Sequence, residues 1–405
     1  MRRLAISTLG SFAGASSPLM NALARCTTTT AQTASQVESV DTSAAGATAQ
    51  HSSPLLNNLR FRVEDIVAGQ TRALAKAITM VESDNPSHAA VIGELLRAVQ
   101  QARKAAAEKE RTSTRNSVVP STLRTVAPRI AISGSPGAGK SCFIEAFGMY
   151  LVEQNLKVGV IAVDPSSAVT GGSILGDKTR MERLSMHPNA FVRPSPSRGH
   201  LGGVTARAWE VMSLLESAHF DVILVETVGV GQSEIAAKYM TDLMILLVPP
   251  ASGDELQGIK KGIVEVADMI LVTKNDGERT GLAQTTLAAY RRAVQYGDNC
   301  GIDKPVLAVS SELGTNIDAV WAAFSKKWRR KLDSGELEQN RKAQQAKHFE
   351  AYFEQELLRR AKEMLAANGG LWGSLHNEVF SGQRAPREAG ELALREVLRP
   401  KKWFQ

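Results

Sequence analysis

A glycine-rich stretch, GSPGAGKS, has residue types and spacing that suit the binding of phosphate. Gly134, Gly139, Lys140 and Ser141 occupy the fixed positions of the pattern G-x-x-x-x-G-K-[ST]. A short apolar run precedes the stretch and a helical pattern follows it, which is the context that such a loop requires. We expect backbone N–H groups to surround the phosphates, Lys140 to reach the β and γ oxygens, and Ser141 to ligate Mg²⁺. The predicted loop contacts are Gly134, Ser135, Pro136, Gly137, Ala138, Gly139, Lys140, Ser141 and Cys142.

An acidic residue follows a later apolar run, VILVET, and suits a magnesium site. Glu226 lies where phosphate-loop enzymes place the acid that holds Mg²⁺ directly or through water. Gly229 follows in the pattern E-x-x-G, where its backbone could approach the γ-phosphate. Loss of that phosphate on hydrolysis would then release the segment as a switch. We therefore expect Lys140 and Glu226 to act in catalysis.

The run MILVTKND indicates which base is bound. Asp276 can accept hydrogen bonds from guanine N1 and N2, a donor pair that adenine lacks, and Lys274 can cover the base. Thr273 stands where most GTPases have Asn. Because a hydroxyl replaces only part of the hydrogen bonding of Asn, the difference should affect nucleotide affinity more than guanine selectivity. The pattern predicts GTP and GDP as ligands, with further guanine contacts from the next strand end. These contacts are Ser310, Ser311 and Glu312.

Two loop-like segments leave their roles open. After the run KVGVIAVD, Asp164 opens a long segment containing Asp177 and Arg180, which are candidates for magnesium contact and for a nucleotide-dependent switch. The alternative is a solvated loop with ordinary surface charges. The stretch PSPSRGHLGGV, residues 194–204, could contact a partner or the phosphates, or be an ordinary loop.

The strand-like runs alternate with helical patterns and predict an α/β fold. Continuous apolar strands of this kind are buried on both faces, so we expect the mostly parallel sheet of a P-loop NTPase, flanked by helices. Amphipathic patterns before and after this region predict helical N-terminal and C-terminal extensions. The expected organisation is a disordered or cleaved segment at 1–45, a helical extension at 58–118, the nucleotide domain at 119–330 and a helical arm at 331–405.

The C-terminal helical region combines alternating charges with an apolar stripe. The charges are typical of a solvated helix face, whereas the stripe could dock onto the nucleotide domain or onto a second subunit. The stripe consists of Trp321, Phe324, Trp328, Phe349, Phe353 and Leu357.

Composition limits the functional classes. The 405 residues carry a net charge of +7, of which three charges come from arginines in residues 1–37, so the remaining +4 does not argue for nucleic acid. No apolar run reaches the length of a membrane span. The three cysteines are too far apart for a disulfide framework or a Cys-x-x-Cys metal site, and Cys142 is interpreted as a small buried helix residue, with a redox role as the alternative.

The N-terminal segment has the composition of a targeting peptide. Residues 1–37 contain no Asp or Glu and are rich in Ser, Thr and Ala beside three arginines. This pattern is typical of a mitochondrial transit peptide and predicts location in the mitochondrial matrix. The alternative is a tail that is merely disordered.

Several long motifs together resemble one known family. GSPGAGKS, VDPSSAVTGGSILGDKTRM, RGHLGGV, ETVGVGQSE, PPASGDELQGIKKGI and TKND are similar in wording and order to the MeaB/ArgK family of metallochaperone-type GTPases, over about residues 58–400. The resemblance implies a homodimeric, Mg²⁺-dependent GTPase that escorts adenosylcobalamin-dependent methylmalonyl-CoA mutase in cofactor loading, protection or reactivation. It also implies a C-terminal dimerisation arm.

The resemblance assigns further roles by position. It implies that residues 249–263, with Asp254, Glu255, Lys260 and Lys261, form an additional switch loop that reports the nucleotide state to the mutase. Gln232 is a candidate for orienting the hydrolytic water, although it lies six positions after Glu226 rather than four as in Ras-type enzymes. Because of that difference, we expect slow intrinsic hydrolysis, and positioning by a partner could complete the site.

Two other functions share the same loop. A small-molecule kinase would prefer ATP and transfer the γ-phosphate to an acceptor, which Asp276 argues against. A metal-delivery GTPase of the nickel or cobalt type usually carries His-rich or Cys-based ligands, and the sequence has no such spacing. Nucleotide preference and stoichiometric metal binding distinguish these functions from the main prediction.

Overall fold

The computed structural model describes most of the chain after residue 54. The described residues are 55–57, 59–83, 85–113, 126–164, 181–196, 201–227, 237–250, 261–297, 304–367 and 369–399. The segment 1–45, Asp177, Arg180, Gly229, Gln232 and residues 251–260 of the expected switch loop lie outside these ranges. No helix in the described ranges is long and apolar enough to cross a membrane.

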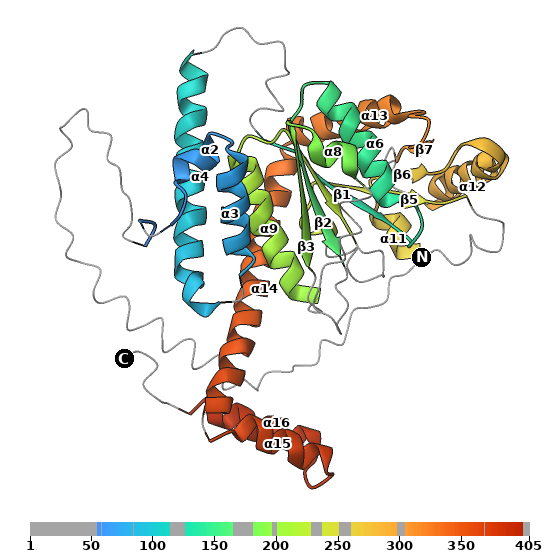
Figure 1. The fold of residues 1–405 in the computed structure, drawn as a ribbon. Helices are drawn as coiled ribbons and strands as arrows, with labels where there is room; N and C mark the ends of the chain where they lie inside the picture. The colour runs from blue at the N-terminus through green and yellow to red at the C-terminus, as the bar shows by residue number, and fades with distance from the viewer. Residues whose placement is uncertain are drawn as a thin grey trace, which may run out of the picture. The chain divides into compact units, whose positions relative to one another are not determined.

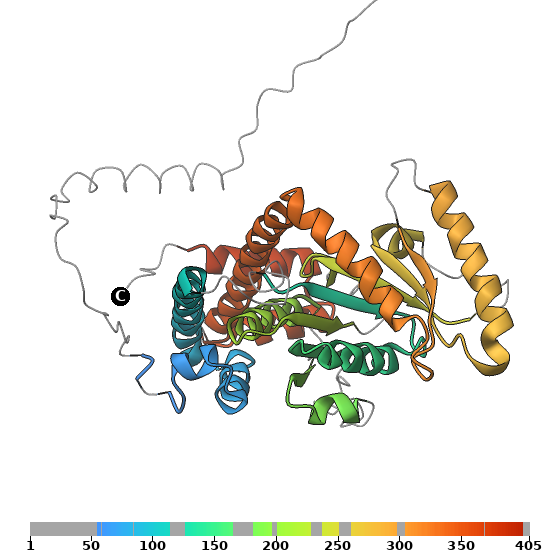
Figure 2. The same ribbon diagram turned by 90° about the horizontal axis from the view of Figure 1, so that it is seen from above.

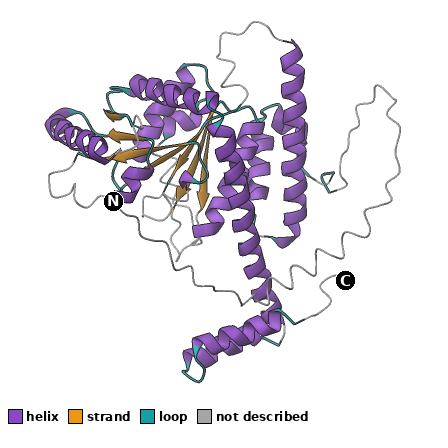
Figure 3. Cartoon of the chain, turned by 180° about the vertical axis from the view of Figure 1, so that it is seen from behind, coloured by secondary structure: helices purple, strands orange, loops and turns teal. Residues whose placement is uncertain are grey.

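A seven-stranded, fully parallel sheet forms the centre of the described structure (Figures 1 and 3). This confirms the predicted α/β fold. The strand order is β3-β2-β4-β1-β5-β6-β7. The strands are β1 Arg129–Gly134, β2 Val158–Asp164, β3 Ala190–Pro196, β4 Val222–Glu226, β5 Leu243–Val248, β6 Met269–Val272 and β7 Val306–Ala308.

Strand β3 was not expected from the sequence. Residues 194–196, interpreted as the start of a loop, continue β3, and Leu201 already begins a helix, so that expectation was wrong at both ends. Pro194 and Pro196 disguise the strand because proline cannot donate to a ladder hydrogen bond. The strand tolerates them because it lies at the end of the strand order, beside β2.

Helices cover both faces of the sheet, and alternate strand residues serve the two cores. Ile130 and Ile132 pack with α6, α8 and α13, whereas Ala131 between them packs with α9 and the N-terminal helices. A third cluster joins β5, β6 and β7 to α11 and α12. The helices are α6 Lys140–Glu153, α8 Glu182–Met186, α9 Leu201–Ser217, α11 Lys261–Val266, α12 Thr280–Gly297 and α13 Ile317–Asp333. Burial on both faces explains why the strands read as continuous apolar runs.

The N-terminal extension packs against α9 (Figures 1 and 2). It consists of α2 Val63–Val67, α3 Thr71–Val81, η1 Pro86–His88 and α4 Ala89–Ser113. Leu74 and Ile78 of α3 and Leu95 of α4 are fully buried in the cluster that includes α9. The extension is thus held to the nucleotide domain by a shared apolar core.

A buried charge network fastens the C-terminal region to the amino ends of the strands. Arg341 of α14, Glu336–Ala367, donates two hydrogen bonds to Asp242, at 2.9 and 2.7 Å, and one of 3.1 Å to Glu216. Arg129 donates a further bond of 2.8 Å to Glu216. Burial acts to raise the pKa of Glu216, but the charges of Arg129 and Arg341 outweigh it and lower that pKa to about 2.

The apolar stripe of the C-terminal region divides between two environments. Phe324 and Trp328 of α13 are buried against the core that contains α6. This half of the stripe therefore docks onto the nucleotide domain, which is one of the two predicted alternatives. Phe349 and Phe353 of α14 are 67% and 56% exposed. Beyond them, α14, α15 Leu371–Phe380 and α16 Pro386–Val397 share a small core of their own. The buried residues of this small core are Leu365, Leu375, Ala389, Ala393 and Val397.

Candidate functional site

The loop between β1 and α6 has the backbone conformation of a phosphate cradle. At Gly134 an added Cβ would lie 2.5 Å from the Leu247 carbonyl oxygen of the neighbouring strand, so a larger residue would displace β5. Gly139 precedes the first turn of α6 with φ of +86°, a left-handed conformation that favours glycine. The loop therefore ends directly at the N-terminus of a 14-residue helix, where backbone N–H groups and the helix dipole favour an anion.

Lys140 lies across this loop. Its Nζ donates hydrogen bonds to the carbonyl oxygens of Gly134, at 2.9 Å, and Ser135, at 3.3 Å. These bonds place the ammonium group beside the concave side of the predicted cradle. A bound phosphate would therefore meet a positive charge there, as the sequence predicts.

Ser141 and Glu226 come together at the carboxyl edge of the sheet. The Ser141 hydroxyl donates to Glu226 Oε1 at 3.0 Å, and both side chains are buried. The strand register accounts for this meeting, because Glu226 ends β4 beside Ile132 of β1. A hydroxyl and a carboxylate are hard oxygen donors of the kind that Mg²⁺ prefers. The two residues fit a magnesium site.

Asp164, a third predicted metal contact, ends the neighbouring strand β2. Glu226 is in register with Ala162, so Asp164 lies two residues further along, at the same edge of the sheet. The backbone thus brings Asp164 toward the predicted metal site. Asp177 belongs to the part of the chain that is not described, and its predicted metal contact stays a prediction.

Thr273 joins the end of β6 to the phosphate loop. Its hydroxyl lies 2.7 Å from the Ala138 carbonyl oxygen and 3.3 Å from that of Val248, and its side chain is only 2% exposed. The single hydroxyl hydrogen serves the nearer oxygen better. The residue that departs from the usual guanine motif therefore ties the base-reading segment to the loop that holds the phosphates.

Asp276 is held by the loop that follows β7. The Ser310 hydroxyl donates to Asp276 Oδ2 at 2.6 Å and accepts the Leu313 backbone N–H at 3.1 Å. Lys274, two residues before Asp276, has a left-handed backbone with φ of +54°. Asn316, which was not singled out from the sequence, supports the loop through a bond of 2.7 Å to the Ala308 carbonyl oxygen.

A cavity of about 800 Å³ lies beside the predicted guanine part of the site and reaches the phosphate loop at Gly139. Lys274, Asp276, Ser311 and Glu312 line it together with Cys142 of α6. Lys140, Ser141 and Glu226 are not among its lining residues. The expectation that Cys142 is buried was wrong, since its side chain is exposed. Cys142 occupies the first turn of α6 on the side that faces the cavity rather than the core.

Sequence reasoning missed several lining residues. Glu145 and Tyr150 of α6, Arg183 of α8, Arg279 and Leu313 also line the cavity. Glu145 accepts backbone N–H groups of Arg183, at 3.0 Å, and Leu184, at 3.2 Å, and so fastens the start of α8 to α6. The available signal in the sequence was Glu145 itself, an acidic residue one helical turn after Ser141. Its partners on α8 lie far away in sequence, so the contact could not be predicted.

Among the described residues, no three His, Cys, Asp or Glu side chains gather into a group that could hold a metal ion. Of the predicted magnesium contacts, the structure brings one hydroxyl and one carboxylate together, those of Ser141 and Glu226. Such a sparse set is usual for Mg²⁺, which retains waters and takes further oxygens from phosphates.

Comparison with known proteins identifies the family. The family described as "Methylmalonyl Co-A mutase-associated GTPase MeaB" matches residues 102–366, which is more than half of the chain. The chain is 40% identical to "Methylmalonic aciduria type A homolog, mitochondrial" of Mus musculus over 82% of its length and 77% of that protein. It is 43% identical to "GTPase ArgK" of Escherichia coli (strain K12) over 72% of its length and 82% of that protein.

A solved structure supports the same conclusion. "Crystal structure of LAO/AO transport system kinase" is 31% identical, covers 83% of this chain and 94% of the solved chain, and superposes with a TM-score of 0.57. The fold, the phosphate loop and the matched motifs agree with each other. The chain therefore belongs to the MeaB family of P-loop GTPases.

Proposed function

We propose that this chain is a metallochaperone-type G protein that assists the loading of adenosylcobalamin onto methylmalonyl-CoA mutase, or the protection or reactivation of that enzyme. The observation that carries the proposal is the family match over residues 102–366, since that family is described by its association with the mutase. The proposal is supported by the meeting of Ser141 with Glu226 beside the phosphate loop, and by the cavity of about 800 Å³ that Lys274 and Asp276 line.

The proposed reaction is hydrolysis of GTP to GDP and phosphate. Lys140 would compensate charge on the β and γ phosphates, while backbone N–H groups of residues 134–142 hold the remaining oxygens. Ser141 and Glu226 would hold Mg²⁺, which supplies charge compensation for the β and γ oxygens when it is bound. Gln232 is proposed to orient the attacking water, and Gly229 to follow the γ-phosphate as part of a switch.

Guanine recognition is proposed to depend on Asp276. The carboxylate can accept hydrogen bonds from both N1 and N2 of guanine, and Ser310 restricts its rotation through the 2.6 Å bond. Lys274 would lie along one face of the base. Thr273 would keep this base-reading group at a fixed distance from the phosphate loop through Ala138.

We further propose a homodimer in the mitochondrial matrix. The exposed rings of Phe349 and Phe353 stack on one another, with centroids 6.3 Å apart, and offer an apolar surface on α14 to a second copy. Location in the matrix is supported by the acid-free residues 1–37 and by the word "mitochondrial" in the name of the mouse relative.

A binding and loading experiment tests the client. The purified chain is incubated with the apo form of an adenosylcobalamin-dependent methylmalonyl-CoA mutase, and complex formation is measured by sedimentation with GTP, GDP or a non-hydrolysable GTP analogue. We expect a stable complex whose cofactor loading depends on which nucleotide is present. A chain that binds GTP but forms no complex in any nucleotide state would exclude the mutase as the client and leave the GTPase intact.

A further inference from the structure

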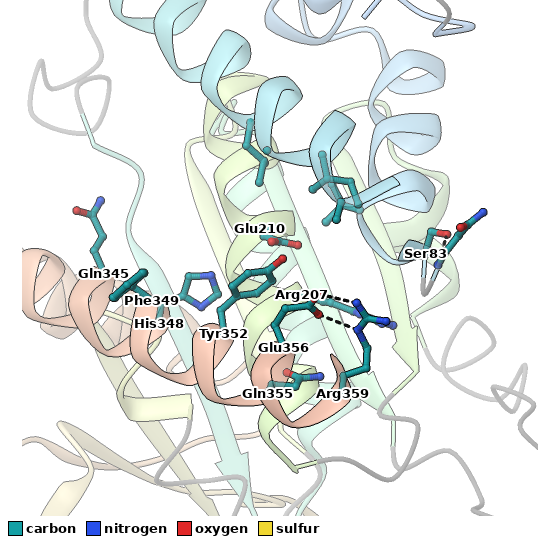
Figure 4. A pocket seen from close by; sticks show the side chains of 16 residues that line it. Ser83, Arg207, Glu210, Gln345, His348, Phe349, Tyr352, Gln355, Glu356 and Arg359 are labelled. Carbon is teal, nitrogen blue, oxygen red and sulfur yellow. Dashed lines mark hydrogen bonds and ion pairs between the residues drawn. The ribbon is translucent and has the colours of Figure 1, made fainter. Parts of the chain in front are cut away.

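A second cavity, of about 460 Å³, lies between the N-terminal extension, α9 and α14 (Figure 4). It shares no lining residue with the nucleotide cavity. Val81, Ile92 and Leu96 form an apolar wall contributed by α3 and α4. The opposite wall carries charged and aromatic side chains of α9 and α14. The volume falls within the range of small-molecule sites.

Glu210 of α9 brings a carboxylate into this cavity without a counter-charge. Within the described ranges, its side chain has no hydrogen bond and no ion pair. Burial raises the pKa of Glu210 to about 7. Glu356, a second described carboxylate of the cavity, differs because Arg359 donates to it at 2.8 Å (Figure 4). Arg360 also donates to it, at 2.7 Å. Glu210 is thus a desolvated acid whose charge the protein itself does not balance.

The positive groups that face the cavity are already engaged. Arg207 donates to the Glu82 carbonyl oxygen at 3.1 Å, and Arg359 pairs with Glu356. His348 stacks on Trp209 with ring centroids 5.5 Å apart, and burial lowers its pKa, which favours the neutral ring. The described lining residues from α3, α4 and their connection carry no charge. Among the described lining residues, no cation is therefore placed to neutralise Glu210.

Aromatic rings lie next to this carboxylate. Tyr352 and Phe349 of α14 line the cavity, and Figure 4 shows the Tyr352 ring beside Glu210. The pKa of Tyr352 is raised by burial first and then by the negative charges of Glu356 and Glu210, which is consistent with that proximity. A carboxylate beside an aromatic ring is an arrangement that attracts an organic cation.

We propose that this cavity binds a small organic cation, a primary ammonium on a short alkyl chain. The ammonium group would pair with Glu210 next to the ring of Tyr352, and the alkyl chain would lie against Val81, Ile92 and Leu96. Pairing offsets the cost of a desolvated carboxylate, which solvent no longer stabilises. Because the lining comes from the extension, α9 and α14, a bound cation would hold these three parts together.

Binding of pentylammonium to the full chain, measured by titration calorimetry at a pH of about 8, tests the proposal. Glu210 is mostly ionised there, because its pKa is about 7. Pentanol is the matched neutral ligand of the same chain length. Glu210→Gln removes the charge and keeps the shape, whereas Glu354→Gln makes the same charge change on α14 at an exposed position outside the cavity. GTP binding by each variant checks that the fold is retained.

The proposal predicts saturable binding of one pentylammonium per chain, at least tenfold weaker in Glu210→Gln and unchanged in Glu354→Gln. Pentanol should give no saturable binding. Equal affinity for pentylammonium and pentanol, equal affinity of the wild type and Glu210→Gln, or no saturable binding of pentylammonium at all would each overturn it. In those cases Glu210 is a half-buried acid that needs no bound cation.

Discussion

Replacement of Thr273 by Val tests whether a single hydroxyl couples the base-reading segment to the phosphate loop. The substitution keeps the branched shape and removes the 2.7 Å hydrogen bond to the Ala138 carbonyl oxygen. Thr273 is 2% exposed, so water does not readily replace the lost donor, and an unsatisfied buried acceptor costs about 1–3 kcal/mol. If this energy holds the loop in its binding shape, GTP affinity should fall about 5- to 150-fold, at about 1.4 kcal/mol for each factor of ten.

The assay is equilibrium binding of a fluorescent GTP analogue, with urea unfolding measured in parallel. Thr273→Ser is the matched control, because it keeps the hydroxyl. It should retain the affinity within about threefold, which corresponds to about 0.7 kcal/mol. Selectivity for GTP over ATP should not change in Thr273→Val, since Asp276 is untouched. If Thr273→Val binds the GTP analogue as tightly as the wild type does, the coupling is refuted. Thr273 would then contribute only to packing of the core.

Two other substitutions address the base site and the charge network. Asp276→Asn should weaken GTP binding by at least about a hundredfold, because two charge-assisted bonds of about 1.5–3 kcal/mol each are lost. The same variant should bind xanthosine triphosphate more tightly than the wild type does. Competition binding that shows neither change would exclude Asp276 from base recognition. Arg341→Met should lower the free energy of unfolding by about 3–5 kcal/mol, measured in urea, because Asp242 and Glu216 stay buried without it. In the wild type, the lowered pKa of Glu216 contributes stability that is complete above about pH 4.5 and is lost as pH falls toward 2. Arg341→Met should reduce that acid dependence, and an unchanged slope would contradict the assignment.

The sheet was predictable where strand residues are apolar without interruption. Ile130, Leu224 and Ile245 belong to such runs, since parallel strands are covered on both faces. Strand β3 was not predicted, because Pro194 and Pro196 are typical of loops. The strand can contain them because it lies at the end of the strand order. Edge position is a property of the tertiary structure and cannot be read from a local pattern.

The predicted site followed from motif spacing, and its supports did not. The motif placed Ser141 and Glu226 at the same sheet edge, where the structure brings them within 3.0 Å. The bond from Thr273 to Ala138 spans 135 positions in sequence, so no local signal reveals it. The exposure of Cys142 depends on which side of α6 meets the core. Glu210 was not noticed, because a single acid on an amphipathic helix is usually solvated.

Turnover of GTP and ATP by the purified chain, with and without an adenosylcobalamin-dependent methylmalonyl-CoA mutase, tests the proposed function most directly. We predict selective GTP hydrolysis that is slow alone and faster when the mutase is present, because a partner would complete the placement of the hydrolytic water. Selective GTP hydrolysis that does not respond to the mutase would contradict the proposed client. A preference for ATP would contradict the assignment of Asp276 and favour the small-molecule kinase.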